Sequence, residues 1–306
     1  MRGLKPFFFN ALKAGSLNPL LNYVQDDNTL DLEIRNNYIN IYYRGGNVLR
    51  VNNDKNLRFV YHFEEKYLNN HPFITPLTLT NFKNNQDWNN FFPLAKQAMD
   101  YYFTKDSKHE REFQQLVVRE NNNSSIANGT DYFIIDIEYD NHAHARFDII
   151  AVEWPSNASK RKMQKDYKPK LVVIEMKYGD HSFKGSAGIH KHISDFNIFS
   201  SDLVKVNEFK NEMLGVFNQK RELGLIPCLS GIGKTNSNAV LQFDDEIEMI
   251  FLIANHDPES KILKIQLSGI QNQNVKFITS NFIGYGLYKE NLFDCPSFIS
   301  RYLAQI

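Results

Sequence analysis

The sequence predicts a mixed α/β protein in which a β-rich N-terminal module precedes a larger domain with a central mixed sheet flanked by helices. Two observations predict this fold class. Apolar residues recur at near-alternating positions in the first hundred residues, as in half-buried strands. Beyond them the pattern changes to one helix, three strands, two helices and further strands. A polar break at 104–108 separates the two patterns and predicts a module of residues 1–105 and a domain of residues 106–306.

The composition is that of a globular protein and excludes several other classes. The 306 residues suffice for one large domain or two ordinary ones at ~150 residues each. Lys+Arg and Asp+Glu balance at 35 each, so any binding of nucleic acid must use a local patch of charge. No run approaches the ~18 apolar residues of a membrane span, and two cysteines are too few for a disulfide framework. We therefore expect a cytoplasmic protein with no membrane partner.

Four short runs in the N-terminal module predict an antiparallel meander after a helical opening. In the first run, apolar residues alternate with charged ones, so we expect one packed face and one face in water. Tyrosines and arginines of the meander could line a nucleic-acid groove, although half-buried strands commonly carry them. The runs are Thr29–Arg35, Tyr38–Arg44, Val48–Val51 and Leu57–Phe63, with a hairpin signal at Gly45-Gly46. The charged residues of the first run are Asp31, Glu33 and Arg35.

The elements of the second domain follow in order along the chain. A helix over 108–120 has Phe113, Leu116 and Val117 at helical spacing. Alternating and apolar runs bounded by polar breaks then predict three strands, and apolar stripes predict two helices. The strands are Tyr132–Asp140, Arg146–Trp154 and Lys170–Tyr178, and the helices are Gly185–Phe199 and Asp202–Leu223.

The third of these strands carries two charges in an apolar setting. Glu175 and Lys177 follow a run of apolar residues and lie two positions apart, so they point to the same side. A buried charge without a partner costs several kcal/mol, so the two side chains must pair with each other or bind a ligand. The second strand carries another acid, Asp148, among apolar residues.

Hairpin arithmetic brings the two acids together. If the second and third strands are antiparallel neighbours, the midpoint of positions 148 and 175 is 161.5, inside the connecting loop, so Asp148 and Glu175 face each other. Two carboxylates with room for water and phosphate suit Mg²⁺ or Mn²⁺. Lys177 could then orient or deprotonate an attacking water, or offset the charge that grows on a phosphate.

These residues resemble the motif of the PD-(D/E)xK nuclease superfamily. The motif places one acid on the second core strand and an acid, any residue and a lysine on the third, which match Asp148, Glu175 and Lys177. The resemblance implies a restriction-endonuclease-like core of a helix, three antiparallel strands, a helix and a further strand, over about 108–257. Phe147 stands where the superfamily often has a proline. The resemblance also implies a nuclease that acts on DNA, in defence, restriction or repair.

A glutamate on the opening helix often completes the metal site in this superfamily. The segment His109–Leu116 resembles the opening helix of archaeal Holliday-junction resolvases, in which the glutamate of a Glu-Arg pair has this role. Glu110 lies at the edge of the apolar stripe and is the preferred candidate. Glu112 lies further towards solvent and Glu120 lies at the helix end, and both stay open as alternatives.

Candidate contacts to nucleic acid lie in a basic loop and around the next helix. The loop 156–169 carries five Lys or Arg against one acid, which suits a phosphate backbone, although a solvated hairpin tip would carry the same charges. Lys184 precedes a helix whose N-terminus could meet a phosphate. His192 lies on the inner stripe of that helix, either as a core histidine or as a phosphate or water contact. The basic residues of the loop are Lys160, Arg161, Lys162, Lys165 and Lys168.

Three other patterns do not lead to a function. Gly231–Thr235 is similar to the end of a P-loop, but Cys228 stands where that motif needs a glycine, so we expect no nucleotide cofactor. The two histidines within 142–144 lack a nearby cysteine and suit a hairpin turn. An alternating acidic face on the first strand is expected in water, and its residues are Asp136, Glu138 and Asp140.

We therefore expect a Mg²⁺- or Mn²⁺-dependent nuclease in which Asp148 and Glu175 hold the metal and Lys177 assists the water. Glu110 or Glu112 would complete the site. DNA is the expected partner and RNA a weaker candidate, and the N-terminal module would recognise the substrate or a second copy of the chain. The alternative is a nuclease-like fold that binds nucleic acid or protein without cutting. Glycoside hydrolysis is disfavoured because the neighbouring lysine would lower a carboxyl pKa that a general acid needs raised.

Overall fold

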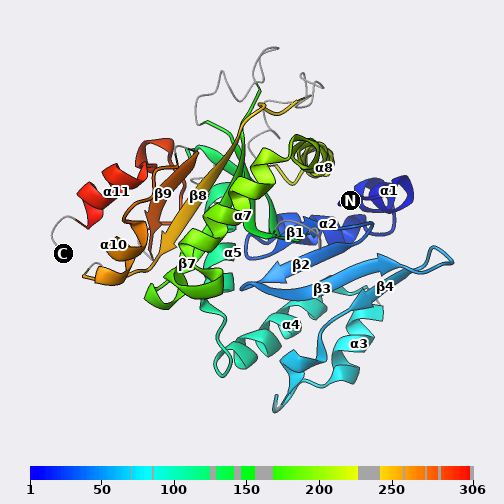
Figure 1. Ribbon diagram of the computed structural model, residues 1–306. Coiled ribbons are helices and arrows are strands. Elements are labelled where there is room, and N and C mark those ends of the chain that lie inside the picture. Colours follow the sequence, from blue (N-terminus) through cyan, green and yellow to red (C-terminus); the bar gives the residue numbers. More distant parts are fainter. Residues whose placement is uncertain are drawn as a thin grey trace. The chain divides into compact units, whose positions relative to one another are not determined.

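The chain folds into two compact units, each with its own sheet and helices (Figure 1). The first unit comprises Met1–Arg119 and Gly215–Pro227, and the second comprises Glu120–Leu214 and Cys228–Ile306. The mixed α/β class is therefore confirmed, whereas a division into functional domains at residues 105 and 106 stays a prediction. The structure is a computed structural model that describes residues 1–69, 71–84, 86–124, 129–140, 146–155, 168–226, 242–257, 259–272, 274–281 and 284–303.

The sheet of the first unit is the antiparallel meander that the sequence predicts. Its strands are adjacent in chain order, and each pairs antiparallel with the next. They are β1 (Asp31–Ile34), β2 (Ile39–Tyr43), β3 (Gly46–Asn53) and β4 (Phe59–His62). The helices of this unit are α1 (Pro6–Ala14), α2 (Asn18–Asp26), η1 (Glu65–Leu68), α3 (Pro76–Asn84) and α4 (Trp88–Phe103), with most of α5 (His109–Asn122) and the end of α8 (Leu203–Glu222).

The turn between β2 and β3 is built from Arg44 and Gly45, both with a left-handed backbone (φ 48° and 74°). Such φ values form the tight turns whose twist matches that of the flanking strands. Gly45 is also required by space, because a Cβ there would lie 2.4 Å from the backbone of Arg111. Arg44 forms ion pairs of 2.8 Å with both Asp100 and Glu112. The hairpin tip is thus fixed on α4 and α5.

The alternation pattern does not predict helices α3 and α4. The asparagine-rich sequence before α4 and Pro93 within it are unfavourable for a helix. Yet Trp88, Phe91, Ala95 and Met99 recur at helical spacing, and all are buried. Burial of such a stripe supplies more helix stability than local propensity does. The N-terminal module is therefore mixed rather than β-rich.

The charged face of β1 is buried and does not lie in water, which corrects our expectation. Glu33 is 0% exposed, and Asp31 and Arg35 are nearly as buried. Lys220 Nζ, near the end of α8, lies 2.8 Å from Glu33 Oε1, and Arg35 NH1 lies 3.7 Å from Glu33 Oε2. Arg35 also donates to the Tyr42 hydroxyl at 3.2 Å. Cations supplied by the fold thus compensate the buried carboxylate.

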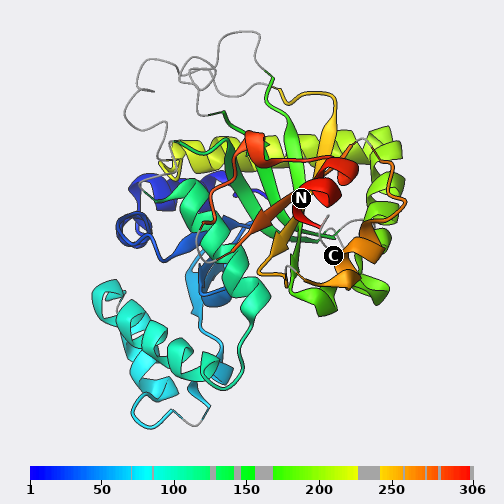
Figure 2. The same cartoon turned by 90° about the vertical axis from the view of Figure 1, so that its left-hand side faces the viewer.

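The sheet of the second unit has the strand order β5-β6-β7-β8-β9 (Figures 1 and 2). The first three strands are antiparallel, and β8 and β9 continue parallel to β7. The three predicted strands and the two helices after them are confirmed to within a few residues. The strands are β5 (Tyr132–Asp140), β6 (Arg146–Glu153), β7 (Leu171–Tyr178), β8 (Ile247–Ala254) and β9 (Val275–Ser280). The helices are η2 (Asp180–Phe183), η3 (Gly185–Ala187), α7 (Ile189–Ser201), α10 (Lys261–Leu267), η4 (Lys289–Asn291) and α11 (Cys295–Tyr302), with the first part of α8.

Strand β7 is the central strand of this sheet and is buried along almost its whole length. Aromatic side chains fasten the helices to the sheet. Phe199 of α7 and Phe209 of α8 pack on Phe147, with ring centroids 5.4 and 5.9 Å away. Phe298 of α11 packs on Phe277 of β9 at 5.7 Å. The burial that the apolar run predicts for β7 is thus confirmed, and it places the two charges of this strand in an apolar environment.

Asn122, the last residue of α5, belongs to the second unit and hydrogen-bonds to β5. Its amide nitrogen donates to Ile134 O and its amide oxygen accepts from Ile134 N, both at 2.8 Å. These bonds lie at a bulge in β5 between Ile134 and Asp136. The first six residues of β5 are all buried, so both faces of the strand are covered there. Asp136 is 0% exposed, so the expectation of an acidic face in water is wrong at this residue.

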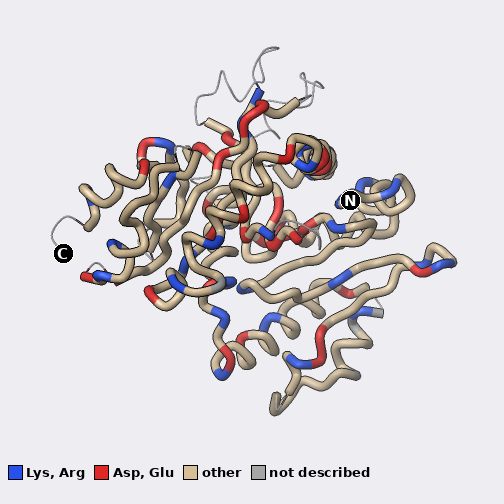
Figure 3. The backbone as a smooth tube through the Cα atoms, in the orientation of Figure 1, with Lys and Arg blue, Asp and Glu red and all other residues tan. Residues whose placement is uncertain are grey.

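Acidic and basic residues are interspersed along the described chain (Figure 3). This agrees with the balanced composition. Attraction of an anionic partner therefore has to come from a local group of side chains. In the part of the chain that the structure describes, no helix has the length and apolar character that crossing a membrane requires.

Candidate functional site

The acid and the lysine of β7 form a buried ion pair. Glu175 and Lys177 are each 4% exposed. Lys177 Nζ donates a hydrogen bond to Glu175 Oε1 at 2.8 Å. The two residues are two positions apart near the carboxyl end of the strand and so point to the same side. The pair compensates both charges, as burial in this strand requires.

Asp148 approaches this pair from the neighbouring strand. The last ladder pair of β6 and β7 is Ile149 with Ile174, and the same register places Asp148 opposite Glu175. This is the register that hairpin arithmetic predicts. The Asp148 carboxylate turns towards β7, where Oδ2 accepts a hydrogen bond from Met176 N at 2.9 Å. The two acids and the lysine of the motif therefore converge at one edge of the sheet.

His192 on α7 is a further neighbour of Glu175. Its Nε2 lies 3.0 Å from Glu175 Oε1, the same oxygen that Lys177 contacts. The helical stripe predicts that His192 faces inward, and the structure identifies the group that it meets. A contact between His192 and nucleic acid stays a prediction. Among the described residues Glu175 Oε2 accepts no hydrogen bond, so this oxygen is the one available to a ligand.

Opposing effects act on the Glu175 carboxyl group. Burial alone would raise its pKa, but the nearby His192 and Lys177 outweigh burial and bring the pKa below its ordinary value. Glu175 is therefore a carboxylate at neutral pH. Metal ligation requires this ionised form. General-acid catalysis of glycoside hydrolysis requires the protonated form and is disfavoured here.

The described residues offer two carboxylates to a divalent cation. No group of three or more His, Cys, Asp and Glu side chains in the described chain is arranged to hold a metal ion. Mg²⁺ commonly binds through one or two protein carboxylates and keeps waters and substrate phosphates as its other ligands. Asp148 and the Oε2 atom of Glu175 fit this mode, whereas a structural zinc site needs four protein ligands.

The two glutamates proposed from α5 differ in their surroundings. Glu112 Oε1 accepts a hydrogen bond from Arg44 Nε at 2.8 Å, so its charge is already compensated within the first unit. Glu110 is half-buried on the same helix. Both belong to the first unit, whereas Asp148 and Glu175 belong to the second. A role in completing the site stays a prediction for both.

Comparison with known proteins gives no match. No protein-family model matches the sequence, and neither the curated proteins nor the solved structures include a significant match. A function for this chain is therefore supported by the geometry and chemistry of its own residues.

Three of the side chains predicted to contact nucleic acid are described. They are Lys168, which is exposed, Lys184 and His192. Lys184 is exposed and lies between η2 and η3, in the segment that leads into α7. Gly188 precedes α7 and supplies no side-chain cap, so a phosphate contact at this helix stays a prediction. The remaining candidates lie outside the described residues and are Lys160, Arg161, Lys162 and Lys165. Residues 142–144, Cys228 and 231–235 also lie outside them.

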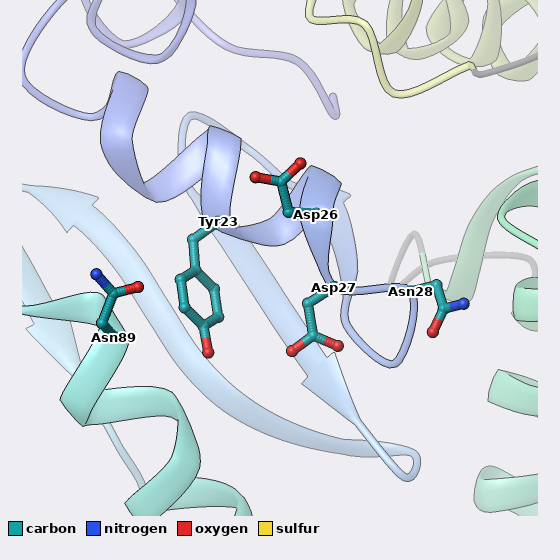
Figure 4. A pocket seen from close by; sticks show the side chains of 5 residues that line it. All are labelled: Tyr23, Asp26, Asp27, Asn28 and Asn89. Carbon is teal, nitrogen blue, oxygen red and sulfur yellow. The ribbon is translucent and has the colours of Figure 1, made fainter.

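The first unit contains a separate polar cavity of about 410 Å³ (Figure 4). Asp27, one of its lining residues, pairs with Lys96 and accepts a hydrogen bond from the Thr29 hydroxyl at 2.7 Å. Burial would raise the pKa of Asp27, but these partners lower it overall. The lining side chains include no cation, so the cavity does not suit a phosphate. They are Tyr23, Asp26, Asp27, Asn28 and Asn89.

Two polar residues close to the β7 site escape prediction from the sequence. Asp180 follows β7, and His256 follows β8. Polar residues just beyond buried strands are a usable signal, because ligands bind at the carboxyl ends of parallel strands. The signal could not be applied without knowing that β8 runs parallel to β7.

Proposed function

We propose that the protein is a metal-dependent nuclease that hydrolyses phosphodiester bonds in DNA. The observation that carries the proposal is the convergence of Asp148, Glu175 and Lys177 at one edge of two antiparallel strands. The element order supports it as well. Helix α5, three antiparallel strands, α7 and the parallel strand β8 follow the order of a restriction-endonuclease-like core.

Each residue of the site has a distinct role in the proposed reaction. Asp148 and Glu175 would hold Mg²⁺ or Mn²⁺, which when bound polarises a phosphoryl oxygen and makes water a better nucleophile. The Lys177 ammonium orients the attacking water or offsets the charge that develops on the phosphate. His192 would orient the Glu175 carboxylate from the side of α7, where its Nε2 lies 3.0 Å from Glu175 Oε1. Such outer contacts fix the orientation of a metal ligand.

The substrate contacts and the cellular setting are further parts of the proposal. The basic loop 156–169, Lys184 and the N-terminal module would hold the DNA, and a second copy of the chain is a candidate partner. We infer a cytoplasmic role in defence, restriction or repair. RNA stays the weaker alternative to DNA as substrate.

A nicking assay tests the proposed reaction. Wild-type protein is incubated with supercoiled plasmid DNA in Mg²⁺, in Mn²⁺ and in excess chelator, beside an Asp148→Ala variant. Asp195→Asn is a matched control because Asp195 is an exposed acid of α7 that pairs with Lys191. We expect nicking by the wild type and the control, and none with chelator or with Asp148→Ala. Equal nicking by Asp148→Ala would exclude the catalytic assignment.

The same assay separates the two glutamates of α5. We expect Glu110→Gln to slow nicking by roughly 10- to 100-fold, as for loss of a group that supports a metal ligand. Glu112→Gln is expected to leave the rate unchanged, because the Glu112 charge is engaged by Arg44. The reverse pattern would assign the role to Glu112.

A second candidate function is binding of nucleic acid or protein without cleavage. The 2.8 Å contact of Lys177 with Glu175 favours it, because each buried charge is then compensated by the other. In this case no preparation nicks DNA, and divalent cations leave the melting temperature of the protein unchanged.

A further inference from the structure

The carboxyl end of β8 lies at the same edge of the sheet as the proposed catalytic site. Asp148 is the third residue of β6, and Lys177 is the last but one of β7, which runs antiparallel to β6. Strand β8 is parallel to β7, and its last pair is Ala254 with Tyr178. The residues that follow β7 and β8 therefore leave the sheet side by side next to the site.

Asp180, the first residue of η2, has an unusual carboxylate. Its Oδ1 atom is buried and has no hydrogen-bond partner among the described residues. The residue as a whole is half-buried, and rotation about the Cβ–Cγ bond exchanges the two carboxylate oxygens. A buried oxygen without a donor is costly, so a ligand with a donor would gain from this position.

His256 is the second polar group at this edge. It is half-buried, and it forms no hydrogen bond or ion pair with the described residues. Burial lowers its pKa, and the charges of Asp180 and Asp257 oppose this shift only in part, so the ring is neutral at pH 7. A neutral imidazole offers one donor and one acceptor.

Contacts outside the strands hold these two residues near each other. Helix η2, which begins with Asp180, packs against α10. The loop that carries His256 joins β8 to α10 and is linked to β7 by a 3.3 Å hydrogen bond from Asn255 Nδ2 to the Tyr178 hydroxyl. The charge of Asp180 is also felt at His256.

We propose that Asp180 and His256 form a base-reading subsite that binds the exocyclic amino group of a nucleobase close to the bond that is cut. This inference rests on the proposed nuclease function. A carboxylate only accepts hydrogen bonds, so its partner must be a donor. Cytosine and adenine present amino donors in the major groove, and guanine presents one in the minor groove, whereas thymine presents an acceptor and a methyl group. The like charge excludes a phosphate from this position.

Distance permits such a contact. Asp180 follows Lys177 by three residues, which is about 10 Å of chain at most at ~3.3 Å per residue. One strand of B-DNA advances ~3.4 Å per nucleotide. Asp180 therefore reaches bases within about three nucleotides of the scissile phosphate.

Sequencing of cut sites in random-sequence DNA tests the subsite independently of the overall rate. We expect wild-type protein to disfavour thymine at one position near the cut by at least about fivefold, the lower limit for a mismatched contact. Asp180→Asn is expected to abolish this bias, and His256→Asn to reduce it. Asp257→Asn is the matched control, since Asp257 is exposed and its carboxylate already accepts from Glu259 N at 2.9 Å. No bias in the wild type, or equal loss of bias in the control, would overturn the proposal.

A binding assay separates failure of the subsite from failure of the nuclease. Short labelled DNAs that carry cytosine or thymine at each position are bound in Ca²⁺, and their affinities are compared. Discrimination by the wild type that is lost in Asp180→Asn supports the subsite even if no preparation cuts DNA. Equal affinities of the wild type for all the DNAs would overturn the subsite, while nicking that depends on Asp148 would leave the nuclease standing.

Discussion

Two strands of the molecule carry an acid, a spacer and a base at identical spacing. Strand β1 and the residue after it contain Glu33 and Arg35, and β7 contains Glu175 and Lys177. Both glutamates are buried, and each has a lysine amino group 2.8 Å from its Oε1. The difference lies in the charges that surround the two glutamates. Glu33 lies near two cations, Lys220 and Arg35. Glu175 pairs with one lysine, and the residue opposite it on the neighbouring strand is a second acid.

The neighbouring strand explains this difference. The residue paired with Glu33 on β2 is the neutral Asn40, and the residue opposite Glu175 on β6 is Asp148. At β1 two cations, Lys220 and Arg35, lie near one acid. At β7 two acids meet beside one lysine, with His192 on an oxygen that the lysine already contacts. An acid, a spacer and a base in one strand therefore do not indicate a metal site by themselves. The feature that distinguishes β7 from β1 is the second acid on the neighbouring strand.

The largest effect is expected when β7 is made to resemble β1. Asp148→Asn replaces the second acid with the neutral residue type that β1 has beside Glu33. Metal-ion catalysis contributes several kcal/mol, so cleavage should fall by about 10³- to 10⁴-fold at 1.36 kcal/mol per tenfold. Single-turnover cleavage of a labelled duplex measures the loss. A fall of less than tenfold would show that the second acid does not distinguish the two strands.

The next largest effect is expected on stability at β1. Glu33→Gln leaves Lys220 and Arg35 buried without their shared anion. Breaking a buried ion pair by removing one partner costs about 3–5 kcal/mol. Urea unfolding measures the loss in the free energy of unfolding, and cleavage per folded molecule should stay at the wild-type rate. A cleavage defect of the size caused by Asp148→Asn would place Glu33 in the active site after all.

Divalent cations should stabilise the folded protein only when both acids of the β7 site are present. A ligand at 100 times its dissociation constant stabilises the folded state by about 2.7 kcal/mol. We expect this increment in wild-type protein and in Glu33→Gln, and its absence in Asp148→Asn. Thermal unfolding in Ca²⁺ against chelator measures it without any cleavage. An equal increment in all three proteins would mean that the cation binds elsewhere.

A smaller effect is expected from His192, the residue of α7 that lies beside the acid of β7. His192→Asn removes the imidazole 3.0 Å from Glu175 Oε1 and leaves both acids in place. Loss of such a second contact typically costs 10- to 100-fold in metal affinity or activity. Titration of the cleavage rate with Mn²⁺ should show a raised half-saturation concentration. An unchanged titration with a slower maximal rate would point instead to a contact between His192 and the substrate.

The two strands also show what the sequence could and could not predict. Asp148 and Glu175 are placed correctly because hairpin symmetry fixes register from position alone. The face of β1 is misplaced because Lys220, which compensates Glu33, is 187 residues away in the chain. A local window cannot contain that partner.

The same reason separates correct predictions from wrong ones elsewhere in the molecule. The inward stripe of α7 shows that His192 faces the core, but only the structure shows that it meets Glu175. Asp136 is buried because both faces of β5 are covered at this point, which the alternation in the sequence does not show. The long helix α4 is missed because an asparagine-rich stretch and Pro93 hide a stripe that only packing makes decisive.

The smallest effect on stability is expected from Tyr43 of β2, whose hydroxyl group is a neutral hydrogen-bond donor. The Tyr43 hydroxyl donates to Asp100, 3.1 Å from each carboxylate oxygen. Burial, then the charge and hydrogen bond of Asp100, raise the pKa of Tyr43 to about 12 from 10.0. Unlike Glu33 it is only half-buried, so solvent screens the interaction and the gain in stability is small.

The sign of the pH dependence follows from the direction of this shift. A raised folded-state pKa favours the neutral tyrosine in the folded protein, so the stabilisation is fully present below pH 10.0 and is lost as the pH rises towards about 12. Other groups titrate in the same range, so the informative quantity is the difference between wild type and Tyr43→Phe. We expect the difference in free energy of unfolding to shrink between pH 9 and 11.5. A difference that stays constant with pH would mean that the Tyr43 side chain contributes packing alone. Its hydrogen bond to Asp100 would then add nothing to the comparison between Glu33 and Glu175.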